Sequence, residues 1–201
     1  MTLLTKSHVK LPQRGRPRSE ESRQSILLGT AAILAERGYE GLSIEAVATK
    51  AEVGKQTIYR WWHSKADLVI DALSELAAQQ VDIPDTGSVT GDLRELLKNA
   101  FFVLTATPSG NAVIGLLVAT QRDTRISKVF RERFVEKRRG AVREIFQRGI
   151  QREQIRANLD TDLIIDLIYG PMWYRLLVGH APLDEVFADT LVEQIMVLLK
   201  E

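Results

Sequence analysis

Five polar side chains within six consecutive positions have the chemistry of a surface that reads nucleic acid: Lys55, Gln56, Thr57, Tyr59 and Arg60. Glutamine and arginine can form paired hydrogen bonds with base edges in the major groove of DNA, and the other three types can bind bases or phosphates. These groups can act together only on one exposed face of a helix. The flanking sequence must therefore hold such a helix against a duplex.

The segment before these residues predicts a short supporting helix. Ile44, Val47 and Ala48 recur at the three- and four-residue spacing of one helix face. Ser43 precedes them, where its hydroxyl can accept from a backbone N–H of the first turn. A tight turn follows over residues 51–54. We expect Gly54 to take there a backbone conformation that most residues avoid.

A second short helix is predicted over residues 55–62. Its apolar residues, Ile58 and Trp62, would be buried, and the five polar side chains would be exposed. Two short helices joined by a turn that contains glycine form a helix-turn-helix. The second helix of this motif enters the major groove of DNA.

The N-terminal segment, residues 1–18, contains five basic residues and no acidic one. Its prolines and glycine, and its low apolar content, predict a flexible arm. In one interpretation it is a disordered tail without contacts. In the other it lies along DNA, and Arg14, Arg16 and Arg18 reach phosphates or a minor groove. Both can hold if the arm orders only on the duplex.

The charge distribution favours a polyanionic partner for the N-terminal third. Residues 1–65 contain eleven Lys or Arg and six Glu, a net charge of +5, whereas the remainder carries −4. A basic head on an acidic body is typical of a chain that binds nucleic acid at one end. A solvated charged face is the alternative, and the asymmetry argues against it.

Two further helices are predicted to frame the helix-turn-helix. The first runs over residues 19–37 and acts as a scaffold, with Gly38 as its C-cap residue. The next opens at a capping box of Ser64 and Asp67. Lys65 lies beside the N-terminus of that helix, where it could help to clamp a phosphate. A solvated lysine is the alternative.

The rest of the chain is also predicted to be helical, so the fold class is all-α. Turn-forming residues at 82–91 precede a helix that ends near Pro108, and a second apolar segment follows. One long charged helix is predicted over residues 125–153, and two more begin near Asp160 and Leu183. We expect three units: a flexible basic arm at 1–18, a helix-turn-helix DNA-binding domain at 19–66, and a larger C-terminal helical domain at 67–201.

Residues 22–68 resemble the DNA-binding domain of the TetR family of bacterial transcriptional regulators. The resemblance rests on Glu36-Arg37-Gly38-Tyr39, on the turn Ala51-Glu52-Val53-Gly54 and on Thr57-Ile58-Tyr59-Arg60-Trp61-Trp62. Small departures are Ala46 for a common acid, Gly54 for a common serine and Trp62 for phenylalanine. Ser43, Tyr59, Trp61 and Lys65 are expected to contact phosphates. The residues expected to face the groove are Lys55, Gln56, Thr57 and Arg60.

The resemblance implies a homodimer, and recognition of two half-sites by paired helices supports it physically. The last two helices carry more than one apolar stripe, so one stripe could form the core and the other the interface. Both stripes could also be core, and the sequence leaves this open. The candidate interface residues are Leu163, Leu167, Leu191, Ile195 and Leu198.

The resemblance also implies that the C-terminal domain encloses a small-molecule effector. Pro171 is expected to interrupt a helix near the pocket. The candidate lining residues are Phe101, Phe102, Leu116, Leu117, Met172, Trp173 and Tyr174, with Arg122, Arg175 and His180 as polar anchors. The alternative for each is an ordinary core or surface position. The sequence does not indicate the chemical class of the effector.

The rival classes have little support in the sequence. The three histidines are scattered, there is no cysteine, and no nucleophile motif or phosphate-binding glycine loop occurs. We therefore expect no enzyme activity, no metal and no cofactor. An architectural DNA binder would rely on arms and wedges rather than a polar reading helix. No apolar run approaches the ~18 residues of a membrane span. The expected function is a cytoplasmic transcriptional regulator, a repressor that binds a palindromic operator as a dimer and is released by a small molecule.

Overall fold

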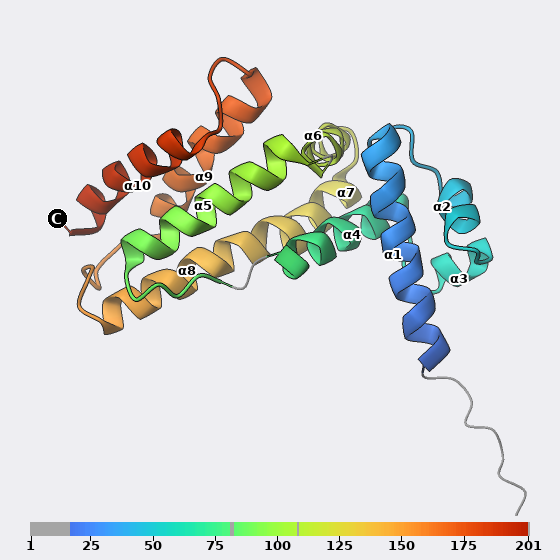
Figure 1. Cartoon of the computed structure of the whole chain (residues 1–201), viewed down its shortest axis with the longest axis horizontal. Helices are drawn as coiled ribbons and strands as arrows, with labels where there is room; N and C mark the ends of the chain where they lie inside the picture. Colours follow the sequence, from blue (N-terminus) through green and yellow to red (C-terminus); the bar gives the residue numbers. More distant parts are fainter. Residues whose placement is uncertain (1–16, 81–82, 108, 201) are drawn as a thin grey trace, which may run out of the picture.

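The computed structural model describes residues 17–80, 83–107 and 109–200, and every regular element in these ranges is helical (Figure 1). This confirms the predicted all-α fold. The elements are α1 (Pro17–Arg37), α2 (Ile44–Lys50), α3 (Lys55–Tyr59), α4 (Lys65–Gln80), α5 (Val89–Ala106), α6 (Ser109–Thr120), α7 (Thr124–Val129), the π-helix η1 (Phe130–Val135), α8 (Glu136–Gln151), α9 (Thr161–Val178) and α10 (Glu185–Lys200).

Helix α1 starts two residues earlier than predicted, at Pro17. Proline suits the first helical position, because its fixed φ angle matches the helix and its missing N–H would be unpaired there anyway. Arg18 therefore lies in the first turn of α1, whereas the sequence placed it in the arm. The C-terminal end is as predicted: Gly38 has a φ of +66° and follows the last residue of the helix.

The described residues form two apolar cores. The first, called here the head core, combines buried residues of α1–α4 with Ala112, Val113 and Leu116 of α6 and with Phe130 and Phe134 of η1. The second, called here the body core, is built from α5, α8, α9 and α10. The helix-turn-helix at one end of the molecule is thus packed together with part of the C-terminal domain, while α9 and α10 lie at the opposite end (Figure 1).

The long charged helix predicted over residues 125–153 is divided into α7, η1 and α8. Within it, η1 has π-helical hydrogen bonding, a feature that occurs as short insertions in α-helices and frequently at functional sites. Phe130 and Phe134 both lie in this segment, stack with ring centroids 4.8 Å apart and are buried. The π segment therefore places two aromatic rings in the head core.

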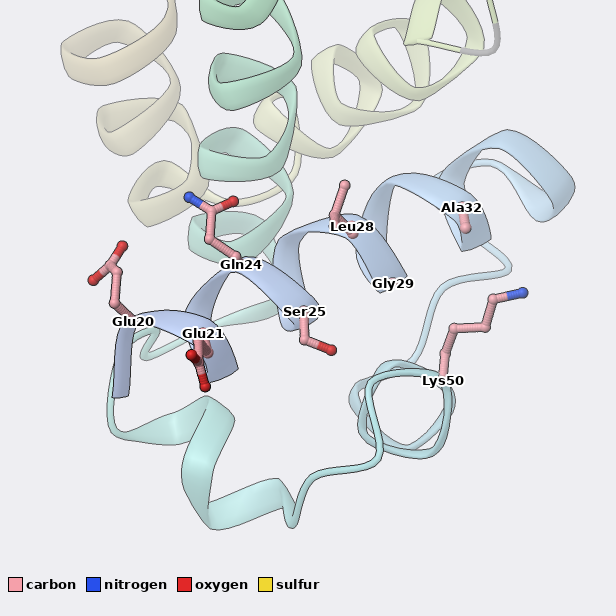
Figure 2. A pocket seen from close by; sticks show the side chains of 8 residues that line it. All are labelled: Glu20, Glu21, Gln24, Ser25, Leu28, Gly29, Ala32 and Lys50. Carbon is pink, nitrogen blue, oxygen red and sulfur yellow. The ribbon is translucent and has the colours of Figure 1, made fainter. Parts of the chain in front are cut away.

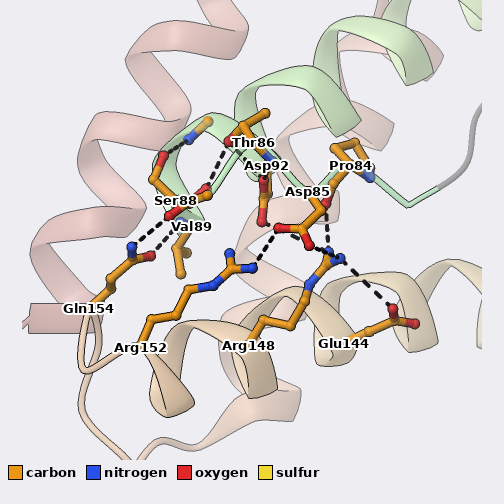
Figure 3. Close-up of polar contacts among 12 residues, drawn as sticks. Pro84, Asp85, Thr86, Ser88, Val89, Asp92, Glu144, Arg148, Arg152 and Gln154 are labelled. Atoms are coloured by element: carbon orange, nitrogen blue, oxygen red, sulfur yellow. Dashed lines mark hydrogen bonds and ion pairs between the residues drawn. The ribbon is translucent and has the colours of Figure 1, made fainter.

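The turn before α5 is fixed to the end of α8 by a polar network (Figure 3). Asp92, which is almost fully buried, accepts hydrogen bonds from the backbone N–H and the hydroxyl of Thr86 at 2.6 and 2.8 Å. Arg148 lies 3.8 Å from Asp92 and 3.6 Å from Asp85, and Arg152 pairs with Asp85 at 2.7 Å. The network holds the start of α5 against the C-terminal end of α8.

One prediction about the C-terminal helices needs correction. Pro171 does not interrupt its helix, since α9 runs through it from Thr161 to Val178 and ends at Gly179, whose φ is +68°. A proline removes one backbone hydrogen bond, and the apolar contacts along α9 outweigh that loss here.

No single helix in the described ranges is long and apolar enough to cross a membrane. Helices α5 and α6 satisfy that criterion only as a pair bent by 88°.

Candidate nucleic-acid interface

Helix α2 is capped as the sequence predicted. Ser43 has an extended backbone, and its hydroxyl accepts a hydrogen bond from the N–H of Ala46 at 3.1 Å. Ile44, Val47 and Ala48 are the buried residues of the helix. This cap keeps Ser43 at the exposed N-terminal end of α2, where the positive end of the helix dipole favours an anion such as a phosphate.

The turn between α2 and α3 differs from the prediction, because the left-handed residue is Glu52 and not Gly54. Glu52 has a φ of 54°, whereas Gly54 has a φ of −73° and serves as the N-cap of α3. The N–H groups of Glu52 and Val53 donate to the carbonyls of Thr49 and Ala48 at 3.3 and 3.0 Å. This is a Schellman motif, which places its left-handed residue directly after the helix C-cap.

The polar surface predicted for α3 is exposed and is called here the reading face, whose contact with DNA stays a prediction. Lys55, Gln56, Tyr59 and Arg60 are exposed, Thr57 is partly exposed, and Ile58 is fully buried beneath them. The helix itself is shorter than the predicted 55–62. It ends at Tyr59, and the chain continues as a turn in which the N–H groups of Trp61 and Trp62 both donate to the carbonyl of Ile58.

The two adjacent tryptophans have different environments. Trp62 is buried, and its indole N–H donates to the Asp71 carboxylate of α4 at 2.9 Å. Trp61 and Tyr59 are exposed on the side of α3, by 39% and 50%. Trp62 therefore ties the turn after α3 to α4, and Tyr59 and Trp61 stay exposed beside it.

Lys55 forms an ion pair across the helix-turn-helix. Its ammonium donates to the Glu45 carboxylate of α2 at 2.9 Å. This hydrogen bond raises the pKa of Lys55 and lowers the pKa of Glu45. Both side chains are exposed, so the pair adds little to stability. It can open when Lys55 meets a phosphate or a base.

Lys65 makes internal contacts that the sequence did not predict. Its ammonium donates to the backbone carbonyls of Tyr39 and Leu42 at 2.9 and 3.0 Å and lies 4.3 Å from the centroid of the Tyr39 ring. Burial lowers the pKa of Lys65. Lys65 thus joins the start of α4 to the loop after α1. The capping box is also formed, since the Ser64 hydroxyl accepts from the Asp67 N–H and donates to its carboxylate.

These contacts lead to a prediction for Lys65. Replacing it with methionine keeps much of the apolar contact with Tyr39 but leaves two carbonyls without their donor. The free energy of unfolding should fall by about 1.5–3 kcal/mol, the range for hydrogen bonds to charged groups. Urea unfolding followed by circular dichroism measures this. Lys50→Met is the matched control, because Lys50 is exposed and pairs with Glu36 at the surface. Equal stability of the Lys65→Met variant and the wild type would mean that the two carbonyls are satisfied by water.

The basic arm is only partly within the described structure. Arg14 and Arg16 lie outside the described residues. Arg18 lies in the first turn of α1. Their expected role on DNA stays a prediction.

The candidate effector residues do not converge on one place. Phe101 and Met172 belong to the body core and Leu116 to the head core, whereas Leu117 and Trp173 are partly buried. Phe102 and Tyr174 are 59% and 60% exposed, and Arg122 is exposed too. Arg175 donates to the carbonyl of Pro182 and stacks on Phe187, and His180 packs against Tyr174. Because they are exposed, Phe102, Tyr174 and Arg122 do not line an interior pocket, and this part of the prediction is wrong. The sequence could not show this, since helical spacing alone does not fix which side of a helix faces the core.

The candidate interface residues separate into two groups. Leu191 and Ile195 are buried in the body core. Leu163, Leu167 and Leu198 are exposed, by 53%, 41% and 38%. Each of the two helices was expected to carry more than one apolar stripe. On α9, Ile164 and Ile168 are core, and Leu163 and Leu167 are surface. On α10, Leu191 and Ile195 are core, and Leu198 is surface.

An open groove on the head contains none of the predicted site residues (Figure 2). It follows α1 from Glu20 and Glu21 at one end to Lys50 of α2 at the other, and Gly29, Leu28 and Ala32 lie between. Lys50 is paired with Glu36 at 3.2 Å. The acidic end of this groove would repel a phosphate, so it does not extend the reading face of α3.

Two family models cover most of the chain. Residues 26–72 match the model described as "Bacterial regulatory proteins, tetR family". Residues 83–195 match "Tetracyclin repressor-like, C-terminal domain". The first model ends within α4, and the second begins at residue 83, just before the polar network of Figure 3.

Relatives and solved structures agree with these models. The chain is 35% identical over 180 residues to the uncharacterized HTH-type transcriptional regulator YdeS of Bacillus subtilis. The matched region covers 90% of each chain. It is 30% identical to the TetR family transcription regulator SCO0332, with a TM-score of 0.80 over 88% of this chain and 97% of that one. FadR of Bacillus subtilis, solved in complex with stearoyl-CoA, is 20% identical with a TM-score of 0.65 over 86% and 97% and shares the fold.

Proposed function

Because the chain belongs to the TetR family of bacterial transcriptional regulators, we propose that it is a cytoplasmic repressor that binds a palindromic operator as a homodimer and leaves it when a small molecule binds the C-terminal domain. The observation that carries the DNA part is the reading face of α3, where four polar side chains are exposed above the buried Ile58. A short helix held in this way can enter a major groove and contact base edges.

The surface of α9 supports the dimer. Its exposed positions Leu163, Leu167, Gly170, Tyr174 and Leu177, called here the α9 stripe, are separated by four, three, four and three residues. This is the spacing of a seam between two helices that cross at a small angle. An apolar stripe of this length is costly to leave in water. A second copy of the chain would cover it and pair two α3 helices for two half-sites.

The shared head core supports control by a small molecule. Helices α6 and η1 of the C-terminal domain contribute buried residues to the same core as α1–α4. A ligand that favours one arrangement of these helices would change the position of α3 and weaken operator binding by its difference in affinity for the two states, typically ~1–3 kcal/mol. The FadR complex with stearoyl-CoA illustrates that a chain with this fold can hold a small molecule.

Selection of bound duplexes from a random pool tests the proposed DNA binding. The full-length protein is incubated with the pool at near-physiological salt, and the retained duplexes are sequenced. A palindromic motif is the expected result. Binding without an enriched sequence would instead favour an architectural role, and no binding by protein freed of small molecules would contradict the proposal.

Arg60 is expected to contribute to sequence preference. Replacing it with alanine should reduce discrimination at one position of each half-site, by about 1–3 kcal/mol for a bidentate base contact. Affinities for the selected operator and its single-base variants, measured at two salt concentrations, show this. Lys137→Ala is the control, because Lys137 is an exposed cation of α8. A uniform loss of affinity on all sequences would place Arg60 on a phosphate.

A further inference from the structure

A partly buried arginine lies between the two cores without an acidic partner. Within the described residues, no carboxylate lies within ion-pair distance of Arg138. By contrast, the other arginines of α8 are paired: Arg139 with Asp162 and Asp166, Arg143 with Glu136 and Asp162, and Arg148 with Asp85, Asp92 and Glu144. The arginine that most needs a counter-charge is thus the one that lacks it.

The contacts of Arg138 place it at the junction of the cores. Its guanidinium lies 3.4 Å from the centroid of the Phe134 ring and donates to the Phe134 carbonyl at 3.0 Å. Phe134 belongs to the head core. The carbonyl of Arg138 accepts a hydrogen bond from the Tyr169 hydroxyl at 3.2 Å, and Tyr169 packs against the body core. Arg138 therefore connects η1 with α9.

Incompletely buried apolar groups also lie where the two cores meet. Leu104 of α5 and Trp173 of α9 contact both cores, and each retains some exposure. Burial lowers the pKa of Arg138 to about 10 and raises the pKa of Tyr169 to about 12. An unpaired cation in a weakly hydrated place is destabilising, and an anion would relieve that cost. A guanidinium presents a fork of donors that matches a carboxylate.

We infer that the junction of the head and body cores binds a small organic anion with an apolar body, and that Arg138 holds its carboxylate. The inference rests on the proposed control by a small molecule and adds the chemical class of that molecule. It also suggests how binding of that molecule could affect the DNA-binding helices. A carboxylate on Arg138 would act on Phe134, which lies in the core that supports α3.

Paired carboxylates and amides test the inference on the full-length protein. The probes are decanoate with decanamide, and 1-naphthoate with 1-naphthamide, so that each pair differs only in charge and headgroup. Affinity is measured by calorimetry, and the shift in melting temperature by fluorimetry. At least one carboxylate should bind about tenfold or more tightly than its amide, the ratio that one charge-assisted hydrogen bond gives.

Variants then assign the preference to one residue. Arg138→Met should abolish the difference between carboxylate and amide, and Arg138→Gln serves if the methionine variant does not fold. Arg143→Met is the matched control, because Arg143 lies on the same helix and is already paired with Glu136 and Asp162. The inference is overturned if no probe pair separates wild type from the Arg138 variants, or if Arg143→Met removes the preference equally.

The outcome can be separated from that of the proposed function. If pool selection gives an operator but carboxylate binding does not depend on Arg138, the inference alone fails. If carboxylate binding depends on Arg138 but pool selection gives no operator, the anion site is supported and the proposed function as a regulator is contradicted.

Discussion

Replacing Trp62 with alanine should lower the free energy of unfolding by about 3–5 kcal/mol, the cost of removing a large aromatic side chain from a packed core. Trp62 is 2% exposed and belongs to the head core. Its indole N–H also donates to one carboxylate oxygen of Asp71. The other oxygen accepts a hydrogen bond from the guanidinium of Arg133 of η1 at 3.3 Å. The substitution therefore opens a cavity and removes a donor at the point where the turn after α3 meets α4 and η1.

Urea unfolding followed by far-ultraviolet circular dichroism measures this effect at one fixed protein concentration, because oligomer stability depends on concentration. Trp61→Ala is the matched control: it removes the same side-chain type one position away, where it is 39% exposed. We expect the control to change stability by less than about 1 kcal/mol. Similar losses for both variants would show that the head core does not depend on Trp62.

Trp62→Phe separates the two contributions of this side chain. Phenylalanine fills most of the space but cannot donate to Asp71, so the variant should lose about 0.5–1.5 kcal/mol, the net value of a hydrogen bond, plus a small packing cost. The comparison bears on the family resemblance, since phenylalanine is common at this position. The tryptophan of this chain adds a hydrogen bond to α4 that phenylalanine cannot make.

The parts of the head that depend on local chemistry could be predicted from the sequence. The spacing of Ile44, Val47 and Ile58 identifies two short helices, and Ser43 stands where an N-cap must be. The capping box at Ser64 follows from residue types alone. Each of these depends on neighbours in the chain, which the sequence displays directly.

The features that sequence reasoning missed depend on contacts between distant residues. Lys65 donates to two carbonyls more than twenty positions earlier in the chain, and no local pattern indicates this. The left-handed residue of the turn is Glu52, because the hydrogen bonds that end α2 determine its place, although glycine suits that conformation best. Helical spacing also gave no means to tell that Phe102 and Tyr174 face outward.

One close approach links the C-terminal domain to the head. A Cβ atom added at Gly115 of α6 would lie 2.8 Å from the Cβ of Tyr39, closer than real side chains come. Only glycine therefore lets α6 pack this closely against the loop after α1. The Tyr39 carbonyl is also one of the two acceptors of Lys65. A movement of α6 would thus reach the start of α4 through Tyr39, which is consistent with control of α3 from the C-terminal domain.

The double substitution Leu163→Glu and Leu167→Glu should separate the proposed dimer into folded monomers. Both side chains are exposed in the single chain, so glutamate at these positions costs the monomer little. In a dimer joined along the α9 stripe, four added carboxylates would face one another in an apolar seam, which is strongly unfavourable. Sedimentation equilibrium should give the mass of one chain, with unchanged helical content by circular dichroism.

Operator binding should fall with the loss of the dimer. When two reading helices are linked, the second binds from an effective concentration set by the linkage, so separation should weaken affinity by on the order of 100-fold or more. Phe102→Glu with Val118→Glu is the matched control, because it adds the same charges at two exposed apolar positions of α5 and α6. If the α9 variant stays dimeric while the control dissociates, the interface lies on α5 and α6. If both stay dimeric and bind the operator normally, the α9 stripe is not the surface that brings two copies together.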